Sequence, residues 1–145
     1  MVIDKSGTWW RGSEAADLHE YLVAFTTDRY PADEIRDSVC NACGGRVFGL
    51  RGDGTEGCGR RVCRRCGRKE YIADSADVWT QARPRTCSCV CGCKDFNLAV
   101  AFALRSSGDV RWVTVGERCV VCGVLGSFVD WGIDYRDSAD LVNRA

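Results

Sequence analysis

Eleven cysteines dominate the chemistry that this 145-residue chain can perform. Two pairs have the spacing C-x2-C, Cys40 with Cys43 and Cys63 with Cys66, and nineteen residues separate one pair from the other. Structural zinc takes four ligands in a tetrahedron, and two cysteines around a tight turn can hold one edge of it. These four cysteines therefore predict one tetrahedral zinc site.

A second metal site is expected around Cys119 and Cys122, which form another C-x2-C pair. Its remaining ligands must come from T-C-S-C-V-C-G-C-K-D-F, where every second position is a cysteine. If this stretch were a straight strand, all four thiols would share one face. The candidates are Cys87, Cys89, Cys91 and Cys93.

An internal repeat narrows the choice among them. The C-G-G-R-V-F that begins at Cys43 matches the C-G-C-K-D-F that begins at Cys91 in its cysteine, its glycine and its phenylalanine. Cys91 therefore takes the place of Cys43 and is a predicted ligand. Cys89 is the nearest cysteine before it and is predicted to complete the pair, with Cys87 or Cys93 as the alternatives.

The cysteines outside the two predicted sites are expected to be small buried hydrophobic residues. One alternative is that Cys58, Cys87 and Cys93 meet and bind a third metal together with His19. Another alternative is a redox role, in which the arginines near Cys58 lower the pKa of its thiol and make it reactive.

The expected compartment favours metal ligands over disulfides. The N-terminal M-V-I-D-K-S-G-T-W-W has no apolar core or cleavage site of a secretory signal, and no apolar run reaches membrane-spanning length. We therefore expect a cytoplasmic protein with no membrane partner, in which thiols stay reduced. The 17 arginines against 3 lysines, with abundant glycine and alanine, indicate a GC-rich bacterial genome.

One helix is expected before the first cysteine. Ser13 is the predicted cap, and Leu18, Leu22 and Phe25 recur at helical spacing. The helix should end near Thr27, because the residue before a proline avoids the α region and Pro31 follows soon after.

From Cys40 onward the sequence changes to short β segments separated by glycine. Strands are predicted at 46–50, 97–104 and 110–115, with turns at 51–57 and 106–109. The tetrapeptide D-S-A-D occurs twice, at 74–77 and 137–140, each time before an apolar residue. Both copies are predicted to start helices, with Asp or Ser as the cap.

These features predict a small, metal-stapled α+β protein that is mostly antiparallel β. Residues 1–37 would form an N-terminal helical segment. Two zinc-ribbon-like units would follow at 38–80 and 81–145, and the second would carry an acidic and aromatic tail.

A family resemblance adds to this interpretation. The pairs C-N-A-C-G with C-R-R-C-G, and C-S-C-V-C-G with C-V-V-C-G, resemble tandem zinc ribbons over about residues 40–128. The tail W-G-I-D-Y-R-D-S-A-D-L is similar to uncharacterised bacterial proteins built on the same plan. The resemblance implies two Zn²⁺ ions. It implies no single function, because zinc ribbons occur in transcription factors, ribosomal proteins, polymerase subunits and adaptors.

Catalysis is not expected. The chain has one histidine and contains no H-E-x-x-H, no P-loop and no G-x-G-x-x-G that opens a helix. Eight cysteines would fill both metal sites, so neither zinc would keep the open position that a catalytic zinc needs. His19, beside Glu20 on the expected helix, is interpreted as a surface or hydrogen-bonded residue.

Protein binding is the favoured function, as an adaptor, a regulator or a toxin-neutralising inhibitor. Aromatic residues dominate interface energies, and acidic groups select basic partners. The predicted contact surface therefore comprises Asp130, Trp131, Asp134 and Tyr135. The alternative for Trp131 and Tyr135 is that they are core residues. The sequence leaves the oligomeric state open.

Nucleic-acid binding is the alternative function. Residues 46–69 carry eight basic and two acidic side chains, and guanidinium groups suit phosphate. The predicted contacts are Arg60, Arg61, Arg64, Arg65 and Arg68. The net charge of zero and the acidic flanks argue against this function, because acidic segments are repelled by phosphate. Alternatively, these arginines pair with the acidic N-terminal segment.

Overall fold

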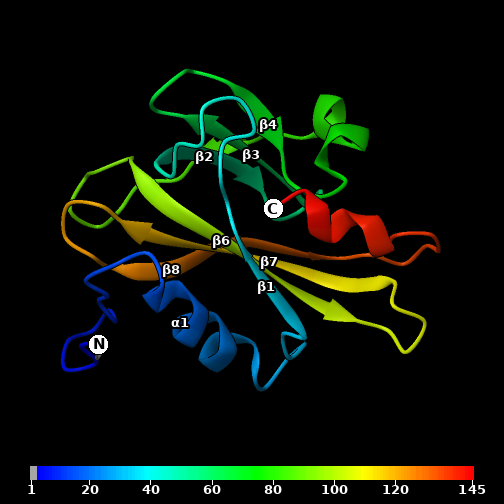
Figure 1. Cartoon of the computed structure of the whole chain (residues 1–145), viewed down its shortest axis with the longest axis horizontal. Coiled ribbons are helices and arrows are strands. Elements are labelled where there is room, and N and C mark those ends of the chain that lie inside the picture. Colours follow the sequence, from blue (N-terminus) through cyan, green and yellow to red (C-terminus); the bar gives the residue numbers. More distant parts are fainter. Residues whose placement is uncertain (1–2) are drawn as a thin grey trace.

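The computed structural model describes residues 3–145, and eight strands in this range form a single sheet. Figure 1 shows how the elements are arranged. One α-helix, α1, spans Asp17–Thr26. The strands are β1 (Glu34–Asp37), β2 (Phe48–Asp53), β3 (Cys58–Cys63), β4 (Lys69–Tyr71), β5 (Arg85–Thr86), β6 (Phe96–Leu104), β7 (Val110–Cys119) and β8 (Leu125–Gly132). Three short 3-10 helices are η1 (Ser75–Asp77), η2 (Trp79–Gln81) and η3 (Ala139–Asn143).

The order of the strands follows the internal repeat. The main path of the sheet is β4-β3-β2-β6-β7-β8, with β1 paired to β6 and β5 paired to β2. Every pairing is antiparallel. The prediction of a small, mostly antiparallel fold with one helix is therefore confirmed. The strands of ranges 38–80 and 81–145 join in one sheet, and the division of the chain into domains stays a prediction.

Equivalent residues of the two repeats occupy equivalent places in their hairpins. Phe48 on β2 lies opposite Cys63 on β3, and Phe96 on β6 lies opposite Cys119 on β7. Each hairpin therefore brings the first cysteine of its C-x2-C pair next to the phenylalanine that follows the preceding cysteine knuckle.

Both D-S-A-D segments start short 3-10 helices with Asp74 and Ser138 at the N-cap positions, as predicted, but neither side chain makes a cap hydrogen bond. The serine hydroxyls bind neighbouring strands instead. Ser75 Oγ accepts a hydrogen bond of 2.8 Å from Gly59 N, and Ser138 Oγ accepts one of 3.0 Å from Val110 N. Both serines are almost fully buried, so each one satisfies a strand N–H that water does not reach.

Helix α1 begins later than predicted. Ala16 is its N-cap residue and makes no side-chain cap, so the prediction of Ser13 as the cap is wrong. A capping Ser13 would accept a hydrogen bond from a helix N–H group. Instead, the carboxylate of the helix residue Asp17 accepts hydrogen bonds from the N–H groups of Ser13 and Glu14. The C-terminal end agrees with the prediction, because the helix stops at Thr26.

Strand β6 separates two apolar layers, as its two faces require. Ala99 and Ala101 lie under the helix with Leu18 and Leu22. The main core on the other face holds larger side chains of the same strand, Leu98, Val100 and Phe102. Small residues on the helix face let α1 approach the sheet closely.

The other predicted strands differ in length. Strand β2 starts at Phe48 and continues to Asp53, and β7 continues beyond residue 115 to Cys119. Over residues 3–145, no helix is long and apolar enough to cross a membrane.

Candidate metal centres

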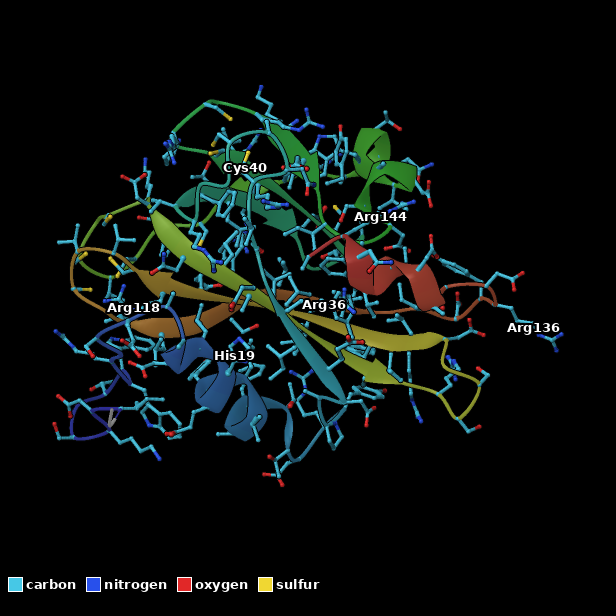
Figure 2. All side chains as sticks on the ribbon, viewed as in Figure 1. His19, Arg36, Cys40, Arg118, Arg136 and Arg144 are labelled. Atoms are coloured by element: carbon cyan, nitrogen blue, oxygen red, sulfur yellow. The ribbon has the colours of Figure 1, made fainter. Side chains whose placement is uncertain are left out.

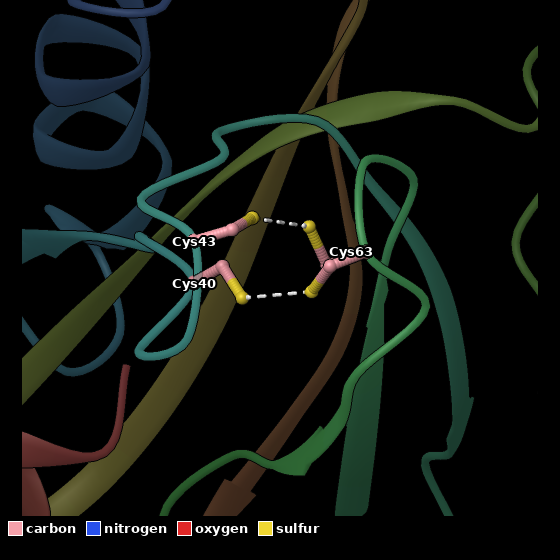
Figure 3. A group of neighbouring side chains, drawn as sticks. Cys40, Cys43 and Cys63 are labelled. Atoms are coloured by element: carbon pink, nitrogen blue, oxygen red, sulfur yellow. Dashed lines mark hydrogen bonds between the residues drawn. The ribbon is translucent and has the colours of Figure 1, made fainter.

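The first four predicted cysteines come together at the ends of β2 and β3 (Figure 3). Cys40, Cys43, Cys63 and Cys66 place their sulfur atoms within 4.8 Å of one another. The Cys40–Cys66 sulfurs are 3.6 Å apart and the Cys43–Cys63 sulfurs 3.5 Å. Four sulfurs at about 2.3 Å from a zinc ion would lie about 3.8 Å apart, so this group has the dimensions of a tetrahedral site.

The second group consists of Cys89, Cys91, Cys119 and Cys122, also within 4.8 Å of one another. The Cys89–Cys122 sulfurs are 3.4 Å apart and the Cys91–Cys119 sulfurs 3.7 Å. The structure thus brings Cys89 to this group, and neither Cys87 nor Cys93 belongs to it. All the cysteines are free thiols.

The backbone of each C-x2-C-G knuckle closes in the same way. Cys40 N–H donates to the carbonyl of Gly45, and Gly44 N–H donates to the carbonyl of Cys40, both at 2.9 Å. The knuckles that start at Cys63 and Cys119 repeat this pair of bonds. Gly44 has φ +74°, and the glycines in the same position of the other knuckles are also left-handed, which is a conformation that favours glycine.

The C-x-C-G knuckle is the same turn shortened by one residue. Cys89 N–H donates to the carbonyl of Cys93, and Gly92 N–H donates to the carbonyl of Cys89, both at 2.8 Å. Gly92 has φ +92°. Cys93 thus closes the turn through its backbone, while its thiol accepts a 3.4 Å hydrogen bond from Asp95 N.

In each group the pKa of at least one thiol is lowered. The backbone N–H groups of Cys66 and Arg65 lower the pKa of Cys63 to about 6. Burial raises the pKa of Cys119, but the N–H groups of Cys122 and Val121 outweigh it and bring the value to about 6. Metal binding requires thiolates, so these turns prepare one ligand of each group for a cation.

Cys58 does not have the environment that a reactive thiol needs. Burial raises the pKa of this thiol, and the carboxylates of Asp53, Glu56 and Asp74 raise it further. The side chain is fully buried on β3. The alternative in which nearby arginines lower the pKa of Cys58 is therefore wrong, because that pKa is raised.

No third cysteine group forms within the described part of the chain. Cys58 and Cys87 are buried, and Cys93 bonds to Asp95. His19 lies on α1 (Figure 2), and its Nε2 is 2.8 Å from Asp37 Oδ1. The histidine is thus hydrogen-bonded at the surface, in agreement with its interpretation from the sequence.

Two of the predicted nucleic-acid contacts are held by other parts of the protein. Arg61 is 4 % exposed, lies 4.7 Å above the Phe48 ring and pairs with Glu70 at 3.5 Å. Arg64 pairs with Asp95 at 2.7 Å. Both acidic partners belong to the cysteine-rich region and not to the N-terminal segment.

The rest of the arginine cluster is partly engaged as well. Arg60 stacks over the Trp79 ring at 4.7 Å, and Arg68 pairs with Glu70 at 3.7 Å. Arg65 is exposed. The expected pairing with the N-terminal segment occurs at Arg46, which lies 3.8 Å from Asp37.

The predicted partner surface divides into a buried and an exposed part. Trp131 is 6 % exposed, and its Nε1 donates to Asp74 Oδ1 at 3.0 Å, so the interpretation of Trp131 as a core residue is confirmed. Tyr135 donates to the other oxygen of Asp74 at 2.7 Å but remains 44 % exposed. Asp130 pairs with Arg29 at 3.0 Å, and Asp134 is exposed. Partner binding by these residues stays a prediction.

A buried glutamate was not anticipated from the sequence. Glu117 on β7 is 7 % exposed and lines a pocket of about 380 Å³ beside the second cysteine group. Burial raises the pKa of its carboxyl to about 8, although a hydrogen bond from Phe128 N opposes the shift. The signal in V-T-V-G-E-R-C is a charged residue inside a long strand, which becomes informative only when both neighbouring strands are known.

Comparisons with protein-family models, with curated proteins and with solved structures find no match to this chain.

Proposed function

We propose that this chain is a tandem zinc-ribbon-like protein that binds two Zn²⁺ ions and contacts a protein partner without catalysing a reaction. Each four-cysteine group offers four sulfur ligands, which is the donor set of structural zinc sites and leaves the ion no open position. Soft thiolates in a tetrahedron select zinc over hard cations such as Mg²⁺. The metal in this proposal stabilises the fold and performs no chemistry on a substrate.

The observation that carries the choice of a protein partner is apolar exposure at the second cysteine group. Val90 lies between Cys89 and Cys91, and Val121 lies between Cys119 and Cys122. Val90 is 62 % exposed and Val121 is 74 % exposed, although the cysteines on either side of them belong to one close group of four sulfurs. Exposed apolar side chains on both knuckles of one cysteine group suit a protein contact.

The distribution of charge favours a protein over a nucleic acid. Arg61 and Arg64 already have acidic partners, so they offer phosphate less than the sequence indicates. Asp134 and Tyr135 remain exposed at the acidic tail, beyond the opposite end of β8 from the second cysteine group, and form a separate second part of the proposed contact surface, for a basic partner. An adaptor, a regulator or an inhibitor that covers a basic site would use such a surface. The proposed location is the cytoplasm, where thiols stay reduced.

The test is capture of partners from a lysate of the source cells with four forms of the chain. The double variants Val90→Ser/Val121→Ser and Asp134→Ala/Tyr135→Ala remove the two parts of the proposed surface. Val23→Ser is the matched control, because Val23 is 53 % exposed on α1 and outside that surface. A protein retained by the native chain and the control, and lost with either double variant, agrees with the proposal.

The same experiment separates the alternative function. If the captured material is nucleic acid that elutes with rising salt, and if both double variants retain it, the protein-binding proposal is wrong.

A further inference from the structure

A pocket with one buried acidic group lies between α1, the N-terminal segment and the start of β8. Its volume is about 380 Å³, which is large enough for a small organic ligand. It shares Trp9, Tyr21, Phe25 and Leu125 with an adjoining hollow of about 300 Å³. The walls are mostly apolar, and five of the side chains that form them are aromatic: Trp9, Tyr21, Phe25, Phe96 and Phe128.

The backbone holds the Glu117 carboxyl in this pocket through a β-bulge. Val115 pairs with Val129 and Gly116 pairs with Ser127, so Phe128 is the extra residue of the bulge. Its N–H donates to Glu117 Oε1 at 3.1 Å. Bulges often re-aim side chains next to functional sites, and here the free N–H of the bulge orients the carboxyl.

The second carboxylate oxygen has space because residue 126 is glycine. A Cβ atom on Gly126 would lie 2.9 Å from Glu117 Oε2. Among the described residues, no donor forms a hydrogen bond to Oε2. The fold thus satisfies one oxygen of the glutamate, and the other lies beside Gly126, which lines the pocket as well.

No basic residue lines the pocket within the described range. The neighbouring Arg118 is held by other partners, because its Nε donates to Gly12 O and its Nη1 donates to Asn97 Oδ1. A buried carboxylate without a counter-charge is costly, and a ligand that brings a positive charge removes that cost. Aromatic faces attract the same kind of ligand.

We propose that this pocket is a binding site for an organic cation of the alkylammonium type. Glu117 supplies the counter-charge, and the rings of Trp9, Tyr21 and Phe25 surround the apolar part of the cation. Cys89 and Val90 also line the pocket, but the inference rests on Glu117 and the aromatic walls and not on the proposed function, and the variants that test it leave both residues unchanged. The competing explanation is that Glu117 only satisfies Phe128 N–H, which a neutral glutamine would do equally well.

The experiment titrates the full chain, as purified, with choline and with 3,3-dimethylbutan-1-ol, which has the same shape without the charge. Amide NMR signals of Gly126 and Phe128 report on the pocket. Both ligands are measured in the same buffer at low ionic strength, where the attraction between opposite charges is least screened. Saturable shifts are expected with choline, and the alcohol should bind about tenfold more weakly.

A lysine-containing tripeptide with blocked ends distinguishes the two sources of an ammonium group. Tighter binding of the peptide than of choline assigns the site to a partner's lysine, and the reverse assigns it to a free small molecule. Both results agree with an ammonium site. If neither cation binds better than the neutral alcohol, the proposal is overturned.

Two variants test the residues directly. Glu117→Gln retains the acceptor for Phe128 N–H and nearly the same volume, so choline affinity should fall about tenfold while binding of the alcohol is unchanged. Trp9→Ala removes a wall residue that is 49 % exposed and should reduce the preference for the cation even if Glu117→Gln does not fold. Tyr71→Ala, which truncates a 40 % exposed aromatic residue outside the pocket, is the matched control. Unchanged choline affinity in Glu117→Gln, or an equal effect of Trp9→Ala and Tyr71→Ala, contradicts the proposal.

Discussion

Phe48 and Phe96 lie directly opposite each other in the pairing of β2 with β6, and both are almost fully buried. They are the same residue of the two repeats, since each stands five positions after the cysteine that opens its matched segment. An antiparallel pair of equivalent residues places an approximate twofold axis between them. The order β4-β3-β2-β6-β7-β8 has the corresponding symmetry, so the repeats meet as the subunits of a twofold dimer do.

Metal removal should unfold the whole sheet and not only the first cysteine unit. Structural zinc sites contribute roughly 10 kcal/mol or more of apparent binding free energy, and one core cluster includes residues of both repeats. Chelation, or Cys43→Ser, should therefore abolish the β signal in circular dichroism in one transition. A chelated sample that keeps its β signal and its melting temperature would contradict the zinc proposal.

The second cysteine group should depend on Cys89 and not on its neighbours. Cys89→Ser should reduce the metal content from two ions to one in native mass spectrometry, because it removes one of the four grouped sulfurs. Cys87→Ala and Cys93→Ala are the matched controls and should keep two ions, since Cys93 closes the knuckle through its carbonyl. Loss of an ion in either control would show that the ligand set is wrong.

The two repeat serines should make similar contributions to stability. Ser75→Ala leaves Gly59 N–H without its acceptor, and Ser138→Ala does the same to Val110 N–H. Each variant should lower the free energy of unfolding by about 1–3 kcal/mol in urea denaturation. Ser107→Ala, in an exposed turn, should change it by less than about 0.5 kcal/mol. Effects no larger than that of the control would mean that the hydroxyls are dispensable.

Neighbouring arginines should differ sharply in their importance for folding. Arg61→Ala removes the buried partner of Glu70, which keeps its contacts with Arg68 and Asn41, and should cost about 1–3 kcal/mol in urea denaturation. Arg65→Ala changes an exposed side chain and should cost less than about 0.5 kcal/mol. Similar costs for the two variants would show that Arg61 is not held as the structure indicates.

Glu117 should make the protein less stable as the pH rises. Its folded-state pKa of about 8 lies above the ordinary value of 4.5, so the folded state binds the proton more tightly than the unfolded state does. The stabilisation is complete below pH 4.5 and is lost as the pH rises through about 8. Between about pH 7 and pH 8, the free energy of unfolding should fall by about 1 kcal/mol relative to Glu117→Gln. Parallel pH profiles for the two proteins would contradict the prediction.

Features that depend on neighbouring residues could be predicted from the sequence alone. The spacing of each cysteine pair and the glycine that follows it define a knuckle, because the turn closes within five residues. The apolar spacing that includes Leu18 and Leu22 indicated the helix, and the apolar run at 97–104 indicated β6. The repeat starting at Cys43 and Cys91 also selected Cys89, since a repeated segment carries its backbone turn with it.

Contacts between distant residues were decided only by the tertiary structure. Trp131 bonds to Asp74, 57 positions away, which makes it a core residue although its acidic neighbours indicated a surface. The pairing of Arg64 with Asp95, and the burial of Glu117 under α1 and β8, depend in the same way on which strands become neighbours. A local pattern determines backbone turns and apolar faces, but the charge that a side chain meets is determined by the packing of the whole sheet.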